Sequence, residues 1–183
     1  MLSKNANFIF KGVFSLFVLL AGCHSVPKQE DPEVIRSAQI IKLSQTLQAS
    51  GARVIQTGQT LKIILPSDRL FAPHSANFVR ASSAMLNTVY RMMAILETTS
   101  AQVAGYSDAE PDALRNKALS IRQAELVADY LWAKGLDARL LYAVGYGSQG
   151  GASAGPPKSL GENANYRIEI SFQYLPLLTS LTQ

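Results

Sequence analysis

Residues 103–131, VAGYSDAEPDALRNKALSIRQAELVADYL, place a strand-like apolar run, a turn and a long amphipathic helix in direct succession. Pro111 suits the first turn of that helix and Gly135 suits its end. Apolar residues recur along it at helical spacing, at Leu114, Ala118, Ile121, Ala124, Val127, Ala128 and Leu131. A helix with one apolar face must bury that face against another element. The stretch therefore predicts a helix that packs on a sheet.

The rest of the chain alternates between strand and helix patterns. Strands are predicted at 52–58, 59–66, 138–147 and 165–174, and helices at 32–50 and 77–98. Gly58 favours a hairpin between the first two strands, and a loop is expected at 67–78. The order β-β-α-β-α-β-β indicates an α/β fold of the α+β sandwich kind, with helices on one face of a small mixed sheet. Helical crossovers imply that some strands pair in parallel.

The N-terminus has the pattern of an export signal that ends in a cysteine. Lys4 and Lys11 supply positive charge, and residues 12–23, GVFSLFVLLAGC, contain an apolar run too short to span a bilayer of about 30 Å. Cys23 ends the run and is the only cysteine, so an intramolecular disulfide is excluded. The pattern resembles the lipobox of bacterial lipoproteins, which implies a lipid on Cys23. The alternative is a free cysteine after an ordinary signal.

A lipid on Cys23 would anchor the chain to a membrane without a spanning helix, because each buried CH₂ group contributes roughly 0.8 kcal/mol. The next residue is His24 rather than the Asp that retains lipoproteins in the inner membrane, so the resemblance implies the outer membrane. The predicted organisation is a signal peptide at 1–22, a lipidated tether at 23–33, an N-terminal helix at 34–52, a folded domain at 53–175 and a C-terminal tail at 176–183.

Composition argues against several classes of function. Without Lys4 and Lys11 the chain keeps 15 basic residues against 13 acidic ones, and it has no block of Lys or Arg, so no nucleic-acid partner is expected. The only histidines are His24 and His74, which leaves no Cys/His nucleophile pair and no metal ligand set once Cys23 is acylated. The glycines at 145–151 lack the Lys-Ser/Thr of a phosphate-binding loop. We expect no enzyme activity, no metal and no cofactor other than the lipid.

Three dispersed motifs carry a resemblance to a known family. They are AGYSDAEPDALRNKALSIRQAELVADYLWAKGL at 104–136, VGYG at 144–147 and NYRIEI at 165–170. In this order they resemble the OmpA-like peptidoglycan-binding domain, and LPSDRLFAPHSANF at 65–78 resembles its first strand and the loop that follows. The likeness covers about residues 54–174. It implies a small mixed sheet with helices on one face and a non-covalent site for the peptide stem of peptidoglycan.

The resemblance also assigns site residues. Asp108 matches the carboxylate that grips the amino group of meso-diaminopimelate, and Asn116 and Ser120 match positions on the following helix. Gln123 stands where the family has an arginine. In the last motif Arg167 keeps one of two family arginines, whereas Tyr166 replaces the other. The implied peptidoglycan-binding residues are therefore Asp108, Asn116, Ser120, Gln123 and Arg167.

Diaminopimelate offers an ammonium and a carboxylate close together, and charge-assisted hydrogen bonds are about twice as strong as neutral ones. Asn116, Ser120 and Gln123 share one helix face that could look toward Asp108. A neutral Gln123 in place of a guanidinium would cost about 1 to 2 kcal/mol. Other interpretations stay open: Asp108 caps the helix, Asn116 is solvated, and Gln123 is exposed and unbound. Arg115 and Arg167 are both candidates to reach into the site.

A narrower resemblance concerns the build of the whole chain. A short lipoprotein with VIQTGQTLKIILPSDRLFAPHSANF at 54–78 is similar to lipoproteins of the Dot/Icm type IVB secretion machine. This implies an outer-membrane lipoprotein that binds peptidoglycan and anchors or scaffolds an envelope complex, with other secretion-complex subunits as partners. The alternative is a purely structural subunit in which wall binding is weakened or lost, because Gln123 replaces the arginine.

Overall fold

The computed structural model describes residues 31–136, 141–149 and 165–174, and its strands form one five-stranded sheet in the order β1-β2-β5-β3-β4. The elements are α1 (Pro32–Ala49), β1 (Arg53–Thr57), β2 (Thr60–Pro66), α2 (Ser67–Leu70), α3 (Ser82–Ile95), β3 (Thr98–Tyr106), α4 (Ala113–Ala133), β4 (Leu141–Gly147) and β5 (Arg167–Tyr174). The mixed α/β fold expected from the sequence is confirmed.

Pairing of the strands follows from how they are connected. β1 and β2 form an antiparallel hairpin, and Gly58 in its turn has φ +58°, a conformation that glycine adopts without steric cost. β3 and β4 are joined through α4 and pair in parallel. β5, the last strand, lies between β2 and β3 and is antiparallel to both. The carboxyl ends of β2, β3 and β4 therefore meet the start of β5 at one edge of the sheet.

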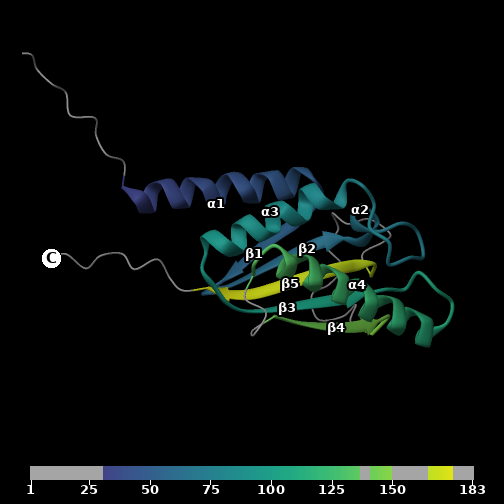
Figure 1. Ribbon diagram of the computed structural model, residues 1–183. Helices are drawn as coiled ribbons and strands as arrows, with labels where there is room; N and C mark the ends of the chain where they lie inside the picture. Colours follow the sequence, from purple (N-terminus) through teal and green to yellow (C-terminus); the bar gives the residue numbers. More distant parts are fainter. Residues whose placement is uncertain (1–30, 137–140, 150–164, 175–183) are drawn as a thin grey trace, which may run out of the picture.

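The helices α1, α3 and α4 lie on one face of the sheet (Figure 1). The core between them is apolar. α1, α2, α3, α4, β2, β3 and β5 contribute buried side chains to it, whereas β1 and β4 contribute partly buried ones. Its members include Ile63 and Leu65 of β2, Val103 of β3, Ile168 and Ile170 of β5, Leu47 of α1, Leu86, Val89 and Met93 of α3, and Val127 and Leu131 of α4. α1 is the outermost helix and packs on α3 and β1.

Helix α4 approaches the sheet so closely that two strand positions must be glycine. A Cβ atom at Gly105 of β3 would collide with the backbone carbonyl oxygen of Ser120, and one at Gly145 of β4 would collide with the backbone nitrogen of Ile121. This close contact fixes the height of α4 above β3 and β4. The start of α4 is thereby held next to the carboxyl ends of these two strands.

The predicted loop at 67–78 and the predicted helix at 77–98 are partly wrong. The loop contains the short helix α2, and it returns through a β-bridge between Phe71 and Phe78, whose rings stack with centroids 4.9 Å apart. Because residues up to 81 complete this return, α3 begins only at Ser82. It ends at Ile95, and Glu97 turns the chain into β3 with φ 51°.

Several sequence-based predictions lie outside the described residues. They are the signal at 1–22, the Cys23 lipidation site, most of the tether at 23–33, and the tail at 176–183. Within the ranges that the structure does describe, no helix combines the length and the apolar character needed to cross a membrane.

Candidate functional site

A cavity of about 480 Å³ lies where the carboxyl ends of β2 and β3 meet the start of β5. Two loops and one strand end line it. Asp68, Phe71, Pro73 and His74 come from the segment after β2, Asp108 and Ala109 from the turn after β3, and Tyr166 from the residue before β5. The sheet order brings these three segments together although they are far apart in the sequence.

Asp108 lines the cavity, is exposed and does not cap α4. The N-cap is Asp112, whose Oδ1 accepts hydrogen bonds from the backbone nitrogens of Leu114 at 2.6 Å and Arg115 at 3.3 Å. The capping interpretation of Asp108 is therefore wrong. Across the described part of the chain, no hydrogen bond satisfies the Asp108 carboxylate.

Asn116 holds the turn that carries Asp108. Its Oδ1 accepts from the backbone nitrogen of Glu110 at 2.9 Å and from Ser107 Oγ at 3.2 Å, and its Nδ2 donates to the carbonyl oxygen of Glu110 at 2.7 Å. The side chain is only 4% exposed, so the solvated interpretation is wrong. Asn116 acts on the cavity indirectly, because it binds the Ser107 hydroxyl before Asp108 and the Glu110 backbone after it.

Ser120 is fully buried one turn further along α4. Its Oγ donates to the carbonyl oxygen of Lys117 at 2.9 Å and accepts from the backbone nitrogen of Gly147 at 2.8 Å. These bonds join the end of β4 to α4. Ser120 is thus on the same helix face as Asn116, as predicted, but it supports the sheet edge and is not part of the cavity wall.

Gln123 is fully buried behind the cavity wall, so its exposed, unbound interpretation is wrong. Its Nε2 donates to the carbonyl oxygen of Ser75 at 2.7 Å and to the Tyr166 hydroxyl at 2.8 Å. Its Oε1 is buried and has no hydrogen-bond partner among the residues that the structure describes. Gln123 therefore reaches the cavity only through Tyr166, which itself is in the wall.

Burial raises the pKa of the Tyr166 phenol, a hydrogen bond from Gln123 opposes this, and the nearby Asp68 carboxylate adds to it. The net effect is a pKa above the ordinary value. Tyr166 consequently stays protonated at neutral pH and presents a neutral hydroxyl to the cavity.

Arg167 points away from this cavity. It precedes the core residue Ile168 on β5, and neighbouring residues of a strand face opposite sides of the sheet. Its Nε donates to Glu169 Oε1 at 2.8 Å, and its guanidinium carbon lies 3.9 Å from the centroid of the Tyr106 ring. Glu169 also forms a salt bridge with Lys62, whose Nζ lies 3.1 Å from Glu169 Oε2. The structure thus brings Asp108, Asn116 and Gln123 to one end of the sheet and leaves Arg167 on its other face.

The sequence analysis missed Asp68 and His74 as parts of the cavity. His74 is an exposed loop residue as expected, but its Nδ1 lies 2.9 Å from Glu110 Oε1 and so links the two loops that line the cavity. A signal for Asp68 is present in the sequence, because it stands two residues after Pro66 at the end of a predicted strand. Finding it required the position of β5 in the sheet.

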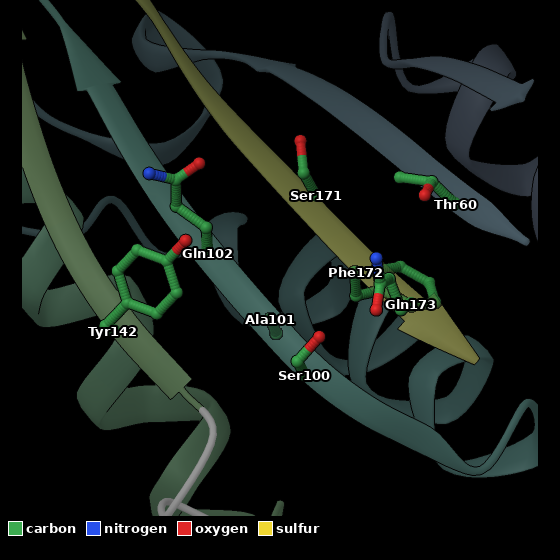
Figure 2. Close-up of a pocket in the computed structure, with 8 residues that line it drawn as sticks. All are labelled: Thr60, Ser100, Ala101, Gln102, Tyr142, Ser171, Phe172 and Gln173. Atoms are coloured by element: carbon green, nitrogen blue, oxygen red, sulfur yellow. The ribbon is translucent and has the colours of Figure 1, made fainter. Parts of the chain in front are cut away.

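A second, shallower cavity of about 170 Å³ lies on the helix-free face of the sheet (Figure 2). Its polar side chains are uncharged and come from four strands. They are Thr60 of β2, Ser100 and Gln102 of β3, Tyr142 of β4, and Ser171 and Gln173 of β5. None of the residues assigned from the sequence lies in its wall.

Comparison with known proteins identifies the family of the chain. Residues 70–166, just over half of the chain, match the model of the OmpA family. The chain belongs to the OmpA family. The matched range includes the segment after β2 from residue 70 onward, the turn with Asp108 and the whole of α4, but not Asp68.

Two curated relatives are lipoprotein or outer-membrane proteins. This OmpA-family chain is 37% identical over 83 residues to outer membrane protein P5 of Haemophilus influenzae, covering 45% of the chain but 24% of that protein. It is 26% identical over 137 residues to the probable lipoprotein YiaD of Escherichia coli, covering 75% of the chain and 62% of YiaD. The chain thus spans about a quarter of the first relative and under two thirds of the second.

Solved structures share the fold. The cell wall anchor of the T6SS from Pseudomonas aeruginosa superposes with a TM-score of 0.62 at 25% identity, over 73% of this OmpA-family chain and 94% of that one. The periplasmic domain of Helicobacter pylori MotB gives 0.56 at 20% identity, over 67% and 82% of the two chains. The second similarity establishes the fold alone.

Proposed function

We propose that this chain is an outer-membrane lipoprotein whose OmpA domain binds the stem peptide of peptidoglycan non-covalently and so anchors an envelope complex to the wall. One observation carries the proposal: the exposed Asp108 carboxylate stands in a cavity, on a turn that the Asn116 side chain holds from both sides. The structural similarity to a cell wall anchor at 25% identity supports it.

The chemistry of binding is an ion pair between Asp108 and an amino group of the stem peptide. Asn116 fixes the turn before the ligand arrives, which lowers the entropic cost of binding. The carboxylate is exposed, so it stays hydrated until a ligand displaces the water. Binding needs no bond to be broken, and we propose that the protein is not an enzyme.

The membrane end of the proposal depends on Cys23. Lipidation there would leave residues 24–31 between the lipidated cysteine and α1, and eight extended residues reach at most about 29 Å. We expect a Cys23→Ser variant to move from the membrane fraction to the soluble periplasmic fraction. A variant that stays with the outer membrane would refute the lipid anchor.

The wall end is tested with purified sacculi and the full chain in detergent. The wild type should be retained, and Asp108→Ala should lose most of the retention. Asp129→Ala is the matched control, because it removes an exposed carboxylate from α4 outside the cavity wall. Equal retention of wild type and Asp108→Ala would remove Asp108 from the site, and loss with Asp129→Ala alone would indicate non-specific charge effects.

A second function is favoured by one observation: Gln123 is neutral, buried and committed to Ser75 and Tyr166. An OmpA domain with a weakened wall site would serve mainly as a structural subunit, and we propose the Dot/Icm type IVB secretion complex as its setting. Copurification of the lipoprotein with a large outer-membrane complex would support this role. Recovery only as a free lipoprotein, together with firm sacculus binding, would contradict it.

A further inference from the structure

The cavity has an unbalanced charge. Two carboxylates, Asp68 and Asp108, line it, and neither Lys nor Arg occurs in the part of its wall that the structure describes. The one basic side chain there is His74, which is engaged by Glu110 at 2.9 Å. An anionic group on a ligand would therefore meet two like charges, with no Lys or Arg among the described wall residues to offset them. An ammonium group would meet two complementary charges.

The hydrogen-bond donors at the back of the cavity are neutral. Gln123 has two N–H donors on Nε2, and both are used, one by the carbonyl oxygen of Ser75 and one by the Tyr166 hydroxyl. Because the Tyr166 oxygen accepts this bond, its own hydrogen remains to be donated. Tyr166 is thus positioned to donate one neutral hydrogen bond to a ligand in the cavity.

We propose that the cavity selects an amine whose neighbouring carboxyl group is absent or amidated, in preference to an amine that stands beside a free carboxylate. This rests on the proposed binding of peptidoglycan stem peptides and names the kind of stem that fits. The ammonium lies between Asp68 and Asp108, and an amide oxygen, where the ligand has one, accepts the hydrogen bond from Tyr166. Lysine and amidated diaminopimelate share this chemistry.

Three synthetic stem peptides test the preference against the full chain in detergent, by calorimetry. They are identical except at the diamino acid, which is lysine, diaminopimelate amidated beside its free amine, or diaminopimelate with that carboxyl group free. We expect the first two to bind about tenfold more tightly than the third, since a repelled or unpaired charge replaces a satisfied contact. Equal affinities, or a preference for the free acid, would overturn the inference and leave the proposed function standing.

Two variants separate the contributions. Asp68→Asn removes one negative charge without changing the shape of the side chain. It should therefore reduce the difference in affinity between the amidated and the free-acid peptides. Tyr166→Phe removes the donor, so it should weaken the amidated peptide and leave the lysine peptide unchanged. If Asp68→Asn leaves this difference in affinity unchanged while the protein stays folded, the Asp68 charge does not determine the preference. If no peptide binds and sacculi are not retained either, the proposed function fails together with this inference.

Discussion

Asp108 and Asp112 stand four residues apart and have separate tasks. Asp112 accepts two backbone hydrogen bonds at the start of α4, whereas Asp108 has its carboxylate in the cavity. We expect Asp112→Ala to lower the free energy of unfolding by about 1 kcal/mol, the usual cost of a lost N-cap. Asp108→Ala should change it by less than about 0.5 kcal/mol, as for other exposed sites.

Urea denaturation followed by circular dichroism measures both changes. A larger loss of stability with Asp108→Ala than with Asp112→Ala would mean that the two roles are assigned the wrong way round.

The raised pKa values of Tyr106 and Tyr166 lead to a prediction about stability at alkaline pH. Burial is the largest cause that raises the pKa of each above the ordinary value of 10.0, with Glu169 adding to it for Tyr106 and Asp68 for Tyr166. Because the pKa is raised, the folded state keeps the phenol protons at a pH where the unfolded state loses them. The stability that these two tyrosines contribute is therefore complete below pH 10 and is lost as pH rises above it.

The free energy of unfolding, measured by urea denaturation from pH 8 upward, should therefore fall above pH 10. The fall should be shallower in a Tyr106→Phe, Tyr166→Phe double variant. An equally steep fall in the double variant would assign the pH dependence to other groups.

Resemblance to a family was enough to predict Asp108, but the side chains around it were harder to find. Asp68 and Tyr166 are nearly a hundred residues apart, and they meet only because β5 inserts beside β2. One signal was available. Tyr166 and Arg167 are neighbours at the start of a strand, so both could not face the same side of the sheet. The alternation with buried Ile168 and Ile170 already placed Arg167 on the outer face.

At the scale of elements, the contact of α4 with the sheet depends on glycines. We expect Gly145→Ala to lower the free energy of unfolding by about 1 to 3 kcal/mol, because its Cβ would have to displace α4 backbone at Ile121. Ser100→Ala, on the helix-free face of β3, is the control and should be near neutral. Thermal and urea denaturation compare the two, and a neutral Gly145→Ala would show that α4 can rise from the sheet without cost.

Periodicity predicted some elements well and others poorly. The predicted helix at 111–135 became α4, Ala113–Ala133, since its apolar spacing is regular and Pro and Gly mark its ends. The helix predicted at 77–98 was too long at both ends, because Phe78 fits the apolar pattern of a helix but pairs with Phe71. No local pattern reveals the central position of β5, which is decided by packing of the whole sheet.

At the scale of the whole molecule, α1 lies outside the matched family range of 70–166 but belongs to the core. Leu47 is 1% exposed, whereas Ile41 on the same helix is 58% exposed. We expect Leu47→Ala to cost about 2 to 5 kcal/mol of the free energy of unfolding, and Ile41→Ala to cost little. If urea denaturation finds Leu47→Ala as stable as the wild type, α1 is an appendage and does not contribute to the fold.

Helix α1 begins at one end of the sheet, and the loops that line the cavity lie at the other (Figure 1). A helix of 18 residues is about 27 Å long. If the chain is held by a lipid before α1 and by the wall at the cavity, tension runs lengthwise through α1 and the strands. The hydrogen bonds of the sheet would then be loaded together, in shear along the strands. Loaded in this way they would resist a larger force than if they were pulled apart one after another.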